Sequence, residues 1–259
     1  MKKMFFGAAL GVCLAAGLAG AAIAQGTNKQ KPKPSQVRDI LFDIAPEIGV
    51  ESLIFYRNIM YFTDGREAYG ASSSLINVDG RVHVVTAKHL LTDSMGIVPS
   101  VPPSRFEEET EGWYVTDNLG YHNMDNASVI VPVAGILEPN DDWNEDFIVL
   151  ETEALTSEFE TEVLPVSFEL PRRGDRVYVF GCTYDAATGC IQAMYPAEVA
   201  GMRFGYLSFR YDMPPSNGSG FSGAPVLNDE GELVAVLTGG YGDLDIAVPL
   251  PDWLAPYTN

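Results

Sequence analysis

The sequence predicts an all-β protein. From about residue 50 onward, the turns between apolar runs contain Asp79-Gly80, Gly174-Asp175 and Glu230-Gly231, and no long amphipathic helix is evident. The runs themselves are short and rich in Val, Ile, Leu, Phe and Tyr: SSSLINV, RVHVVTA, WYVTD, SVIVPV, DFIVLET, DRVYVFG, YLSFRYD and LVAVLTGG. Many short strands at regular spacing are typical of a β-barrel or β-sandwich.

The first 24 residues have the features of a secretory signal peptide. Two lysines open the chain, an apolar run rich in Ala, Gly and Leu follows, and Ala22-Ile23-Ala24 fits the small-x-small cleavage pattern. The alternative is an uncleaved membrane anchor, because the apolar run is nearly long enough to span a bilayer. The Gly and Ala content and the cleavage site favour removal. We therefore expect an exported protein, periplasmic or secreted, with no stable membrane anchor after cleavage.

Residues 25–49 are expected to form a linker or N-terminal arm. Residues 25–36, QGTNKQKPKPSQ, are polar and contain prolines, whereas residues 37–46 have apolar positions at helical spacing and predict a short helix that stops at Pro46. The sequence leaves open whether the arm is cleaved, inhibits or packs on the domain.

The composition restricts the class of partner. Hydrophobic residues make up 46% of the 259 residues, enough for a substantial core, and the formal net charge is −19. A surface this acidic repels phosphate backbones, so no nucleic-acid partner is expected. The charge keeps the protein in solution without identifying its function, and the oligomeric state is not determined by the sequence.

Two cysteines follow the signal segment, Cys182 and Cys190 in GCTYDAATGC. The residues between them can turn the chain, and export leads to an oxidising compartment, so we favour a disulfide across a hairpin. Such a bond stabilises a domain by about 2–3 kcal/mol. Two free thiols are the alternative. We expect no metal site, because no His or further Cys lies nearby to complete four ligands.

His89 is a candidate general base. In VVTAKHLL, residues 84–91, a β-run ends at Thr86-Ala87 and the histidine follows as the chain turns. A histidine at a strand end is rigidly positioned yet accessible, and an imidazole exchanges protons near neutral pH. Taken alone, a structural histidine would be the better interpretation.

Asp146 is a candidate partner for that histidine. It opens the apolar strand of NEDFIVLET, residues 144–152, where a carboxylate can accept a hydrogen bond from an imidazole N–H. An ordinary solvated acid is the alternative. Asp125 is the reserve candidate, since MDNASVIV also opens a β-run.

Ser222 is a candidate nucleophile within NGSGFSGAPVL. A serine hydroxyl needs a base to take its proton, and the developing oxyanion needs preorganised donors such as backbone N–H groups. Gly220 and Gly223 permit the sharp turn and close approach that such a site requires. A Gly/Ser turn leading into a strand is the alternative.

The three stretches together resemble the trypsin-like (chymotrypsin-fold) serine peptidases. T-A-x-H, D-[FIL]-x-x-L and G-x-S-G-x-P occur in the chain order His, Asp, Ser, each beside a β-run. The similarity spans about residues 70–250. It includes three stretches: GASSSLINVDGRVHVVTAKHLL, RRGDRVYVFG and GELVAVLTGGYGDLDIAVPL. The first of them resembles bacterial members of the family such as the HtrA-like group.

The resemblance implies two six-stranded antiparallel β-barrels with the active site in the cleft between them. The peptidase domain would span residues 50–252, with halves at about 50–155 and 165–252. The matching triad is His89, Asp146 and Ser222, with no cofactor required. The N–H groups of Gly220 and Ser222 would form the oxyanion hole. Thr238, Gly239 and Gly240 would pair with an extended substrate. Ser216 and Asn217 would lie near the primary specificity pocket.

The departures from the family pattern are also informative. Phe221 stands where digestive members have an Asp that pairs with a freshly cut N-terminus, so we expect no activation through that ion pair. Ala224 replaces a common Gly. No charged residue is evident at the pocket positions, so specificity for basic or acidic side chains is unsupported. Too few residues follow Ser222 for an appended peptide-binding domain, so a single peptidase domain is expected.

The leading functional hypothesis is an exported serine endopeptidase that acts on a peptide or protein substrate through an acyl-enzyme. One alternative is a catalytically silent domain of the same fold that binds peptides or another exported protein. A third interpretation is an esterase on the same scaffold. Turnover of unfolded protein or of an activated ester distinguishes a catalyst from a binder.

Overall fold

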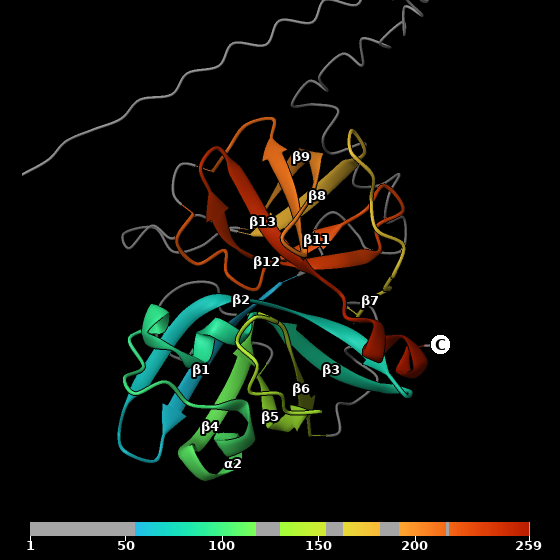
Figure 1. The fold of residues 1–259 in the computed structure, drawn as a ribbon. Helices are drawn as coiled ribbons and strands as arrows, with labels where there is room; N and C mark the ends of the chain where they lie inside the picture. The colour runs from blue at the N-terminus through green and yellow to red at the C-terminus, as the bar shows by residue number, and fades with distance from the viewer. Residues whose placement is uncertain (1–54, 118–129, 154–162, 182–191, 216–217, 259) are drawn as a thin grey trace, which may run out of the picture. The chain divides into compact units, whose positions relative to one another are not determined.

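The computed structural model describes residues 55–117, 130–153, 163–181, 192–215 and 218–258 (Figure 1). All of them belong to one compact unit, residues 32–259. Several sequence predictions lie outside the described residues. They are the signal peptide, the arm and its helix at 37–46, the reserve acid Asp125, the pocket residues Ser216 and Asn217, and the cysteines Cys182 and Cys190. Within the described ranges, no helix is long and apolar enough to cross a membrane.

The first barrel is built from the strands β1 to β6, which pair in the antiparallel order β1-β4-β5-β6-β3-β2 and close through the β1–β2 pair. A short strand β7 (Val163–Leu164) adds to β2 in parallel. The bounds are β1 (Tyr56–Phe62), β2 (Glu67–Val78), β3 (Arg81–Thr86), β4 (Thr110–Thr116), β5 (Ile130–Leu137) and β6 (Ile148–Thr152).

The second barrel closes in the order β10-β13-β12-β11-β8-β9, also antiparallel (Figure 1). Its strands are β8 (Arg176–Gly181), β9 (Ala193–Arg203), β10 (Tyr206–Tyr211), β11 (Pro225–Leu227), β12 (Leu233–Tyr241) and β13 (Leu244–Pro249). The predicted fold class, an all-β protein of two six-stranded antiparallel barrels, is therefore confirmed.

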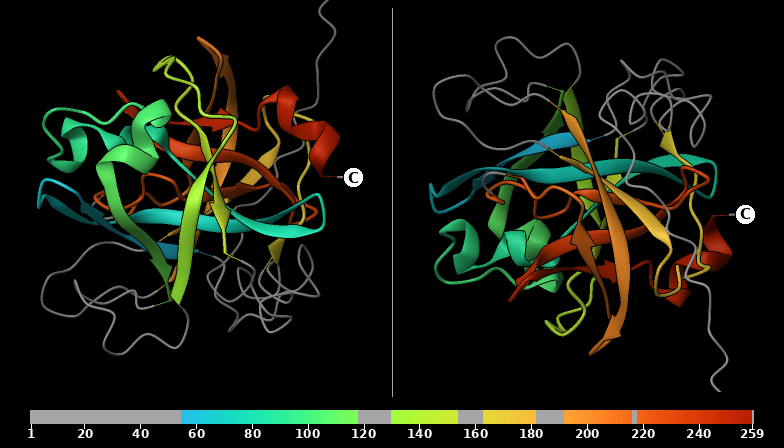
Figure 2. Two further views of the ribbon diagram at one scale, coloured as in Figure 1. Left: turned by 90° about the horizontal axis from the view of Figure 1, so that it is seen from below. Right: turned by 90° about the horizontal axis from the view of Figure 1, so that it is seen from above.

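The helical segments are short. They are η1 (Lys88–Leu91), η2 (Asp93–Met95), η3 (Pro103–Arg105), α2 (Phe106–Glu109) and η5 (Asp252–Tyr257). The C-terminal η5 lies beside the β2–β3 turn, as Figure 2 shows, and Asp79 N–H donates to the carbonyl of Tyr257 at 2.6 Å. The chain therefore ends by returning from the second barrel to the first.

Three buried apolar clusters hold this arrangement together. One fills the first barrel around Leu75, Val84 and Trp113, and another fills the second around Phe209 and Val226. The third contains residues of both barrels, including Phe55, Ile76, Val85, Phe147, Phe180 and Leu233. Because interiors are close-packed, this shared cluster fixes one barrel against the other. Residues carried by different barrels can then form one site of constant geometry.

Candidate active site

His89 is positioned by the transition from β3 to η1. Its flanking residues Leu90 and Leu91 are fully buried and anchor the turn. The carbonyl of His89 accepts hydrogen bonds from the Thr92 hydroxyl at 2.6 Å and from the Ser94 hydroxyl at 2.8 Å. These contacts hold the main chain at His89, while 22% of its side chain stays exposed.

The carboxylate of Asp146 binds His89 with both oxygens. Oδ1 accepts from the main-chain N–H of His89 at 2.7 Å, and Oδ2 lies 2.7 Å from Nδ1 of the ring. A carboxylate only accepts, so the proton belongs on Nδ1, and the lone pair of the neutral ring is on Nε2. The contact therefore sets the tautomer that a general base requires.

The loop that presents Asp146 is supported from several directions. The ammonium of the buried Lys88 donates to the carbonyl of Asp142 at 2.8 Å, and its burial lowers the pKa of this lysine. From the second barrel, the Tyr206 hydroxyl donates to the carbonyl of Asn144 at 3.1 Å. From η5, Trp253 Nε1 donates to Glu145 at 3.3 Å. These contacts hold the loop and so limit the movement of the Asp146 carboxylate.

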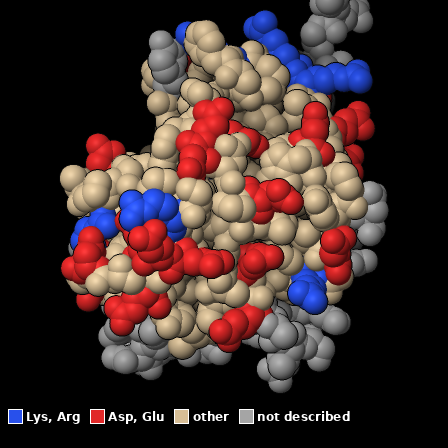
Figure 3. All heavy atoms as spheres, turned by 60° about the horizontal axis from the view of Figure 1, so that its bottom comes forward, with Lys and Arg blue, Asp and Glu red and all other residues tan. Residues whose placement is uncertain are grey.

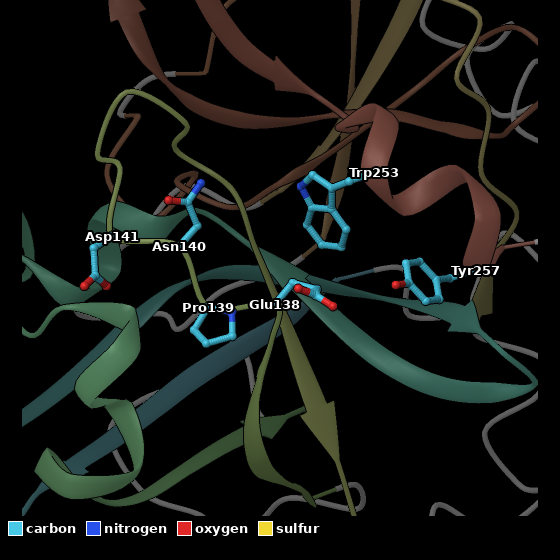
Figure 4. Close-up of a pocket in the computed structure, with 6 residues that line it drawn as sticks. All are labelled: Glu138, Pro139, Asn140, Asp141, Trp253 and Tyr257. Atoms are coloured by element: carbon cyan, nitrogen blue, oxygen red, sulfur yellow. The ribbon is translucent and has the colours of Figure 1, made fainter.

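A hollow of about 500 Å³ lies beside the same loop, and Figure 4 shows the side chains that line it. It is lined by loop residues Glu138, Pro139, Asn140 and Asp141 and by Trp253 and Tyr257 of η5. None of the sequence-predicted site residues lines it. The hollow lies between the loop and η5.

Ser222 is held against the first barrel through its main chain. The N–H of Ser72 on β2 donates to the carbonyl of Ser222 at 2.6 Å. The next residue, Gly223, has φ +82°, and a Cβ there would lie 1.8 Å from the carbonyl oxygen of Ser72 and 2.3 Å from Oγ1 of Thr86. Only glycine fits such an approach. Since Thr86 is three residues before His89, the serine turn lies against the strand end that carries the histidine.

Two N–H groups of the turn at Ser222 have no main-chain acceptor among the described residues. Within the described residues, the N–H groups of Phe221, Gly223 and Ala224 donate to main-chain carbonyls at 2.8–3.2 Å, whereas those of Gly220 and Ser222 have no such partner. Gly220 has φ +89°, a left-handed backbone conformation that fits the sharp turn expected at this glycine. These two N–H groups are the ones that the family resemblance implies for the oxyanion hole.

A pocket of about 400 Å³ opens beside the serine. It is lined by Ser222, Gly239 and Gly240, together with Tyr211, Pro214, Pro215, Gly218, Phe221, Leu237 and Asp245. Thr238 is not among the lining residues. It lies in a bulge between Leu237 and Gly239, where the register of β12 against β13 shifts.

Two residues near this site were missed by the sequence reasoning. Asp245 lines the pocket beside Ser222, and the sequence reasoning did not single it out. The place of Asp245 in the pocket depends on strand register. β13 pairs Asp245 with Gly240 of β12, and this pairing can be assigned only when the position of the β12–β13 turn is known. Arg57, far away in sequence, donates to the carbonyl of Gly220. No local sequence motif identifies Arg57 or Asp245.

The site contains no evident metal-binding group. Across the described residues, no three His, Cys, Asp or Glu side chains gather closely enough to hold a metal ion. The site instead contains a His–Asp pair and a serine on a pocket wall, which are groups of the kind that nucleophilic acyl transfer uses.

Solved structures of other proteins share this fold. The fold is similar to the serine endoprotease from Yersinia pestis, with TM-score 0.53 and 19% identity over 84% of this chain and 64% of that chain. It is also similar to the thermostable serine protease AL20 from an extremophilic microorganism, with TM-score 0.52 and 14% identity over 76% of this chain and 90% of that one. At these identities the likeness shows the fold alone, and the chain covers less than two thirds, 64%, of the Yersinia protein.

Among curated protein sequences, none matches the chain. The family model for the trypsin-like peptidase domain matches residues 71–236, which is more than half of the sequence and includes His89, Asp146 and Ser222. The chain therefore belongs to the trypsin-like peptidase domain family, a family of serine endopeptidase hydrolases.

Proposed function

We propose that this protein is an exported serine endopeptidase that hydrolyses peptide bonds through an acyl-enzyme, with His89, Asp146 and Ser222 as the catalytic triad. The active site lies in the cleft between the two barrels, with His89 and Asp146 from the first barrel and Ser222 from the second. The observation that carries the proposal is the double contact of Asp146 with His89, at 2.7 Å to the main-chain N–H and 2.7 Å to the ring.

This double contact is not what a solvated, non-catalytic aspartate would be expected to make. A solvated aspartate has no need to engage both the amide and the ring of one histidine. Holding Nδ1–H directs the lone pair of Nε2 away from Asp146, and a carboxylate there stabilises the imidazolium when Nε2 takes a proton. The geometry therefore supports a base poised for one proton transfer.

The chemical steps follow from this assignment. Ser222 Oγ attacks the scissile carbonyl while its proton moves to His89 Nε2, and the carbonyl oxygen becomes an oxyanion bound by the N–H groups of Gly220 and Ser222. The tetrahedral intermediate then collapses, and His89 returns the proton to the leaving amine. Water enters and loses a proton to His89 as it attacks the acyl–serine ester. His89 then gives this proton to Ser222 Oγ as the ester bond breaks and the acid product leaves. The enzyme returns to its initial state with one peptide bond hydrolysed.

The substrate is an extended polypeptide in this proposal. The edge at Thr238, Gly239 and Gly240 pairs with its backbone, and the pocket beside Ser222 receives one side chain. Export rests on the signal segment, residues 1–24, with its A-x-A site. In the periplasm or outside the cell, Cys182 and Cys190 would be oxidised to a disulfide.

The test uses the chain from residue 25 onward, incubated with a fluorescently labelled unfolded protein and, separately, with an activated ester. We expect the wild type to cleave both, and Ser222→Ala and His89→Ala to cleave neither at more than about a thousandth of the rate. Ester hydrolysis without proteolysis would support an esterase instead. Binding of the unfolded protein without any turnover would support a silent binding domain, and either result overturns the proposal.

A further inference from the structure

The hollow beside η5 brings aromatic rings and carboxylates together. Trp253 and Tyr257 line it from η5, and Glu138 and Asp141 line it from the loop that follows β5 (Figure 4). Among the described residues, no lysine or arginine lines this hollow of about 500 Å³, and it shares no lining residue with the pocket at Ser222. Its groups therefore offer π-faces and negative charge, and they are separate from the groups of the proposed reaction.

The aromatic side chains of the hollow are held in place by contacts with the rest of the fold. Trp253 Nε1 donates to Oε1 of Glu145 at 3.3 Å, and Oε2 of the same carboxylate accepts from Nδ2 of Asn140 at 3.2 Å. The main-chain carbonyl of Tyr257 accepts from the N–H of Asp79 at 2.6 Å. Both aromatic side chains also pack against the buried cluster that the two barrels share. A ligand would therefore meet preformed walls, which lowers the entropic cost of binding.

Of the two lining carboxylates, Glu138 is the one that is open to a ligand. Asp141 already accepts hydrogen bonds from the N–H and the hydroxyl of Ser104, at 2.9 Å and 2.6 Å. Glu138 is exposed, and its side chain has neither an ion pair nor a hydrogen bond within the described residues. In Figure 4 it extends from the loop toward Tyr257, below the indole of Trp253. A free carboxylate thus lies in the same hollow as the two aromatic side chains.

Negative charge on this loop exceeds the positive charge that the described residues place beside it. Asp141, Asp142 and Glu145 lie close enough to Lys88 to interact with its charge. Lys88 is only 1% exposed, and its ammonium donates to the carbonyl of Asp142 at 2.8 Å. This lysine is therefore not available to an anion from solution, and the hollow should repel anions and attract cations.

We infer that the hollow binds an arginine side chain of a partner polypeptide. The guanidinium group is planar, stacks on aromatic faces and pairs with carboxylates, and it is more weakly hydrated than the ammonium of lysine. In the bound state it lies against the indole of Trp253 and pairs with Glu138, while its methylene groups pack on Pro139. This docking site goes beyond the proposed function, because it uses neither Ser222 nor His89.

The general acidity of the protein is a competing explanation for any affinity for cations. Acidic side chains are spread over the face shown in Figure 3, and the formal net charge is −19. Such a surface attracts cations from a distance and loses this effect in salt. A specific role for Glu138 therefore has to be separated from the loss of one negative charge. Glu111 provides the matched control, since it is an exposed glutamate on β4 that does not line the hollow.

NMR of the indole N–H groups reports binding at the hollow directly. The chain has three tryptophans, and the signal of Trp253 is identified by its loss in Trp253→Phe. The protein would be the chain from residue 25 onward with Ser222→Ala, so that the probe is not cleaved. It would be titrated at moderate salt with a capped Gly-Arg-Gly peptide and, separately, with the same peptide containing citrulline, the neutral isostere of arginine.

We expect the arginine peptide to shift the Trp253 signal to saturation and the citrulline peptide to bind about 10-fold more weakly. Glu138→Gln should weaken binding of the arginine peptide by about 2- to 5-fold, the range for one exposed charge pair, whereas Glu111→Gln should not change it. Equal binding of the two peptides, equal losses in the two variants, or no shift of the Trp253 signal would overturn the inference.

The same spectra distinguish a partner polypeptide from the other occupants. If the N-terminal arm of the chain itself filled the hollow, Arg38→Gln would shift the Trp253 signal before any peptide is added. If a second copy of the chain filled it, the signal would depend on protein concentration. Either result would overturn the assignment to a partner. A signal that is unaffected by both changes and shifts with the arginine peptide supports it.

Discussion

The buried guanidinium of Arg57 donates a hydrogen bond to the carbonyl oxygen of Gly220, 3.0 Å away, and so ties β1 of the first barrel to the turn before Ser222. It also donates to the carbonyl of Ala71 at 3.1 Å. The Ser72 hydroxyl donates to the same Gly220 oxygen at 2.8 Å. The turn is therefore held by groups of the first barrel.

The residue that follows Gly220 completes this support. Phe221 is buried, its ring packs against Gly181 of β8, and it makes an edge contact with Tyr195 at a centroid distance of 5.3 Å. An apolar side chain here cannot form an ion pair with a new N-terminus. Apolar packing and Arg57 together provide a physical reason why the turn is ordered without such a pair.

Replacing Arg57 by Met should lower kcat by about 10- to 100-fold with a smaller effect on KM, because the proposed oxyanion donors, the N–H groups of Gly220 and Ser222, would lose their fixed orientation. Arg105→Met is the control, since that arginine is about half exposed and lies away from the turn. Steady-state kinetics and Tm would be measured together. A loss of activity that merely follows a loss of folded protein would contradict a positioning role.

Gly223→Ala should destabilise the fold by about 3 kcal/mol or more, because it combines the left-handed backbone cost with a clash against Ser72. Gly65→Ala is the matched control, since Gly65 has φ +84° against +82° for Gly223 but nothing within 4 Å of its added Cβ. The control should cost only about 1–2 kcal/mol. Urea unfolding measures both, and equal costs would show that the close approach does not matter.

Asp146→Asn should reduce kcat by roughly 10³–10⁴-fold while the protein remains folded, because the amide no longer enforces the proton on Nδ1 of His89. The control is Asp141→Asn on the same loop, where the carboxylate binds Ser104 instead. Peptide hydrolysis and circular dichroism would be compared for both variants. Similar activities of the two variants would show that Asp146 is a structural acid.

Asp245→Asn should raise the Tm at neutral pH. Burial raises the pKa of Asp245 in the folded state, so its contribution to stability is full below the unfolded value and is lost as the pH rises through the folded value. Asn does not titrate. The Tm advantage of the variant should therefore be small at pH 4 and larger at pH 7, as measured by scanning calorimetry. A variant that is less stable at pH 7 would indicate that the carboxylate supports the fold.

The barrel architecture could be predicted because alternating apolar runs and Gly-containing turns are local features of a strand. The positive φ of Gly220 and Gly223 could also be anticipated, since a sharp turn before a strand favours glycine. His89, Asp146 and Ser222 could be proposed as a triad because each belongs to a short motif beside a β-run.

Arg57 and Asp245 could not be identified in this way. Arg57 reaches Gly220 across a sequence separation of 163 residues, and it looks like any other charged residue in a strand. Asp245 faces the pocket because of the β12–β13 register, which includes a shift at Thr238. A shift of one residue would place its side chain on the opposite face of the strand. Such positions depend on pairing and packing that motifs do not encode.

The central claim is that Ser222 is an activated nucleophile, and the most direct measurement is intact-mass labelling with a fluorophosphonate. Wild-type protein from residue 25 onward and Ser222→Ala would be treated side by side, and peptide mapping would locate the adduct. The account predicts one adduct on Ser222 of the wild type and none on the variant. A well-folded wild type that remains unlabelled, or one labelled elsewhere, would contradict it.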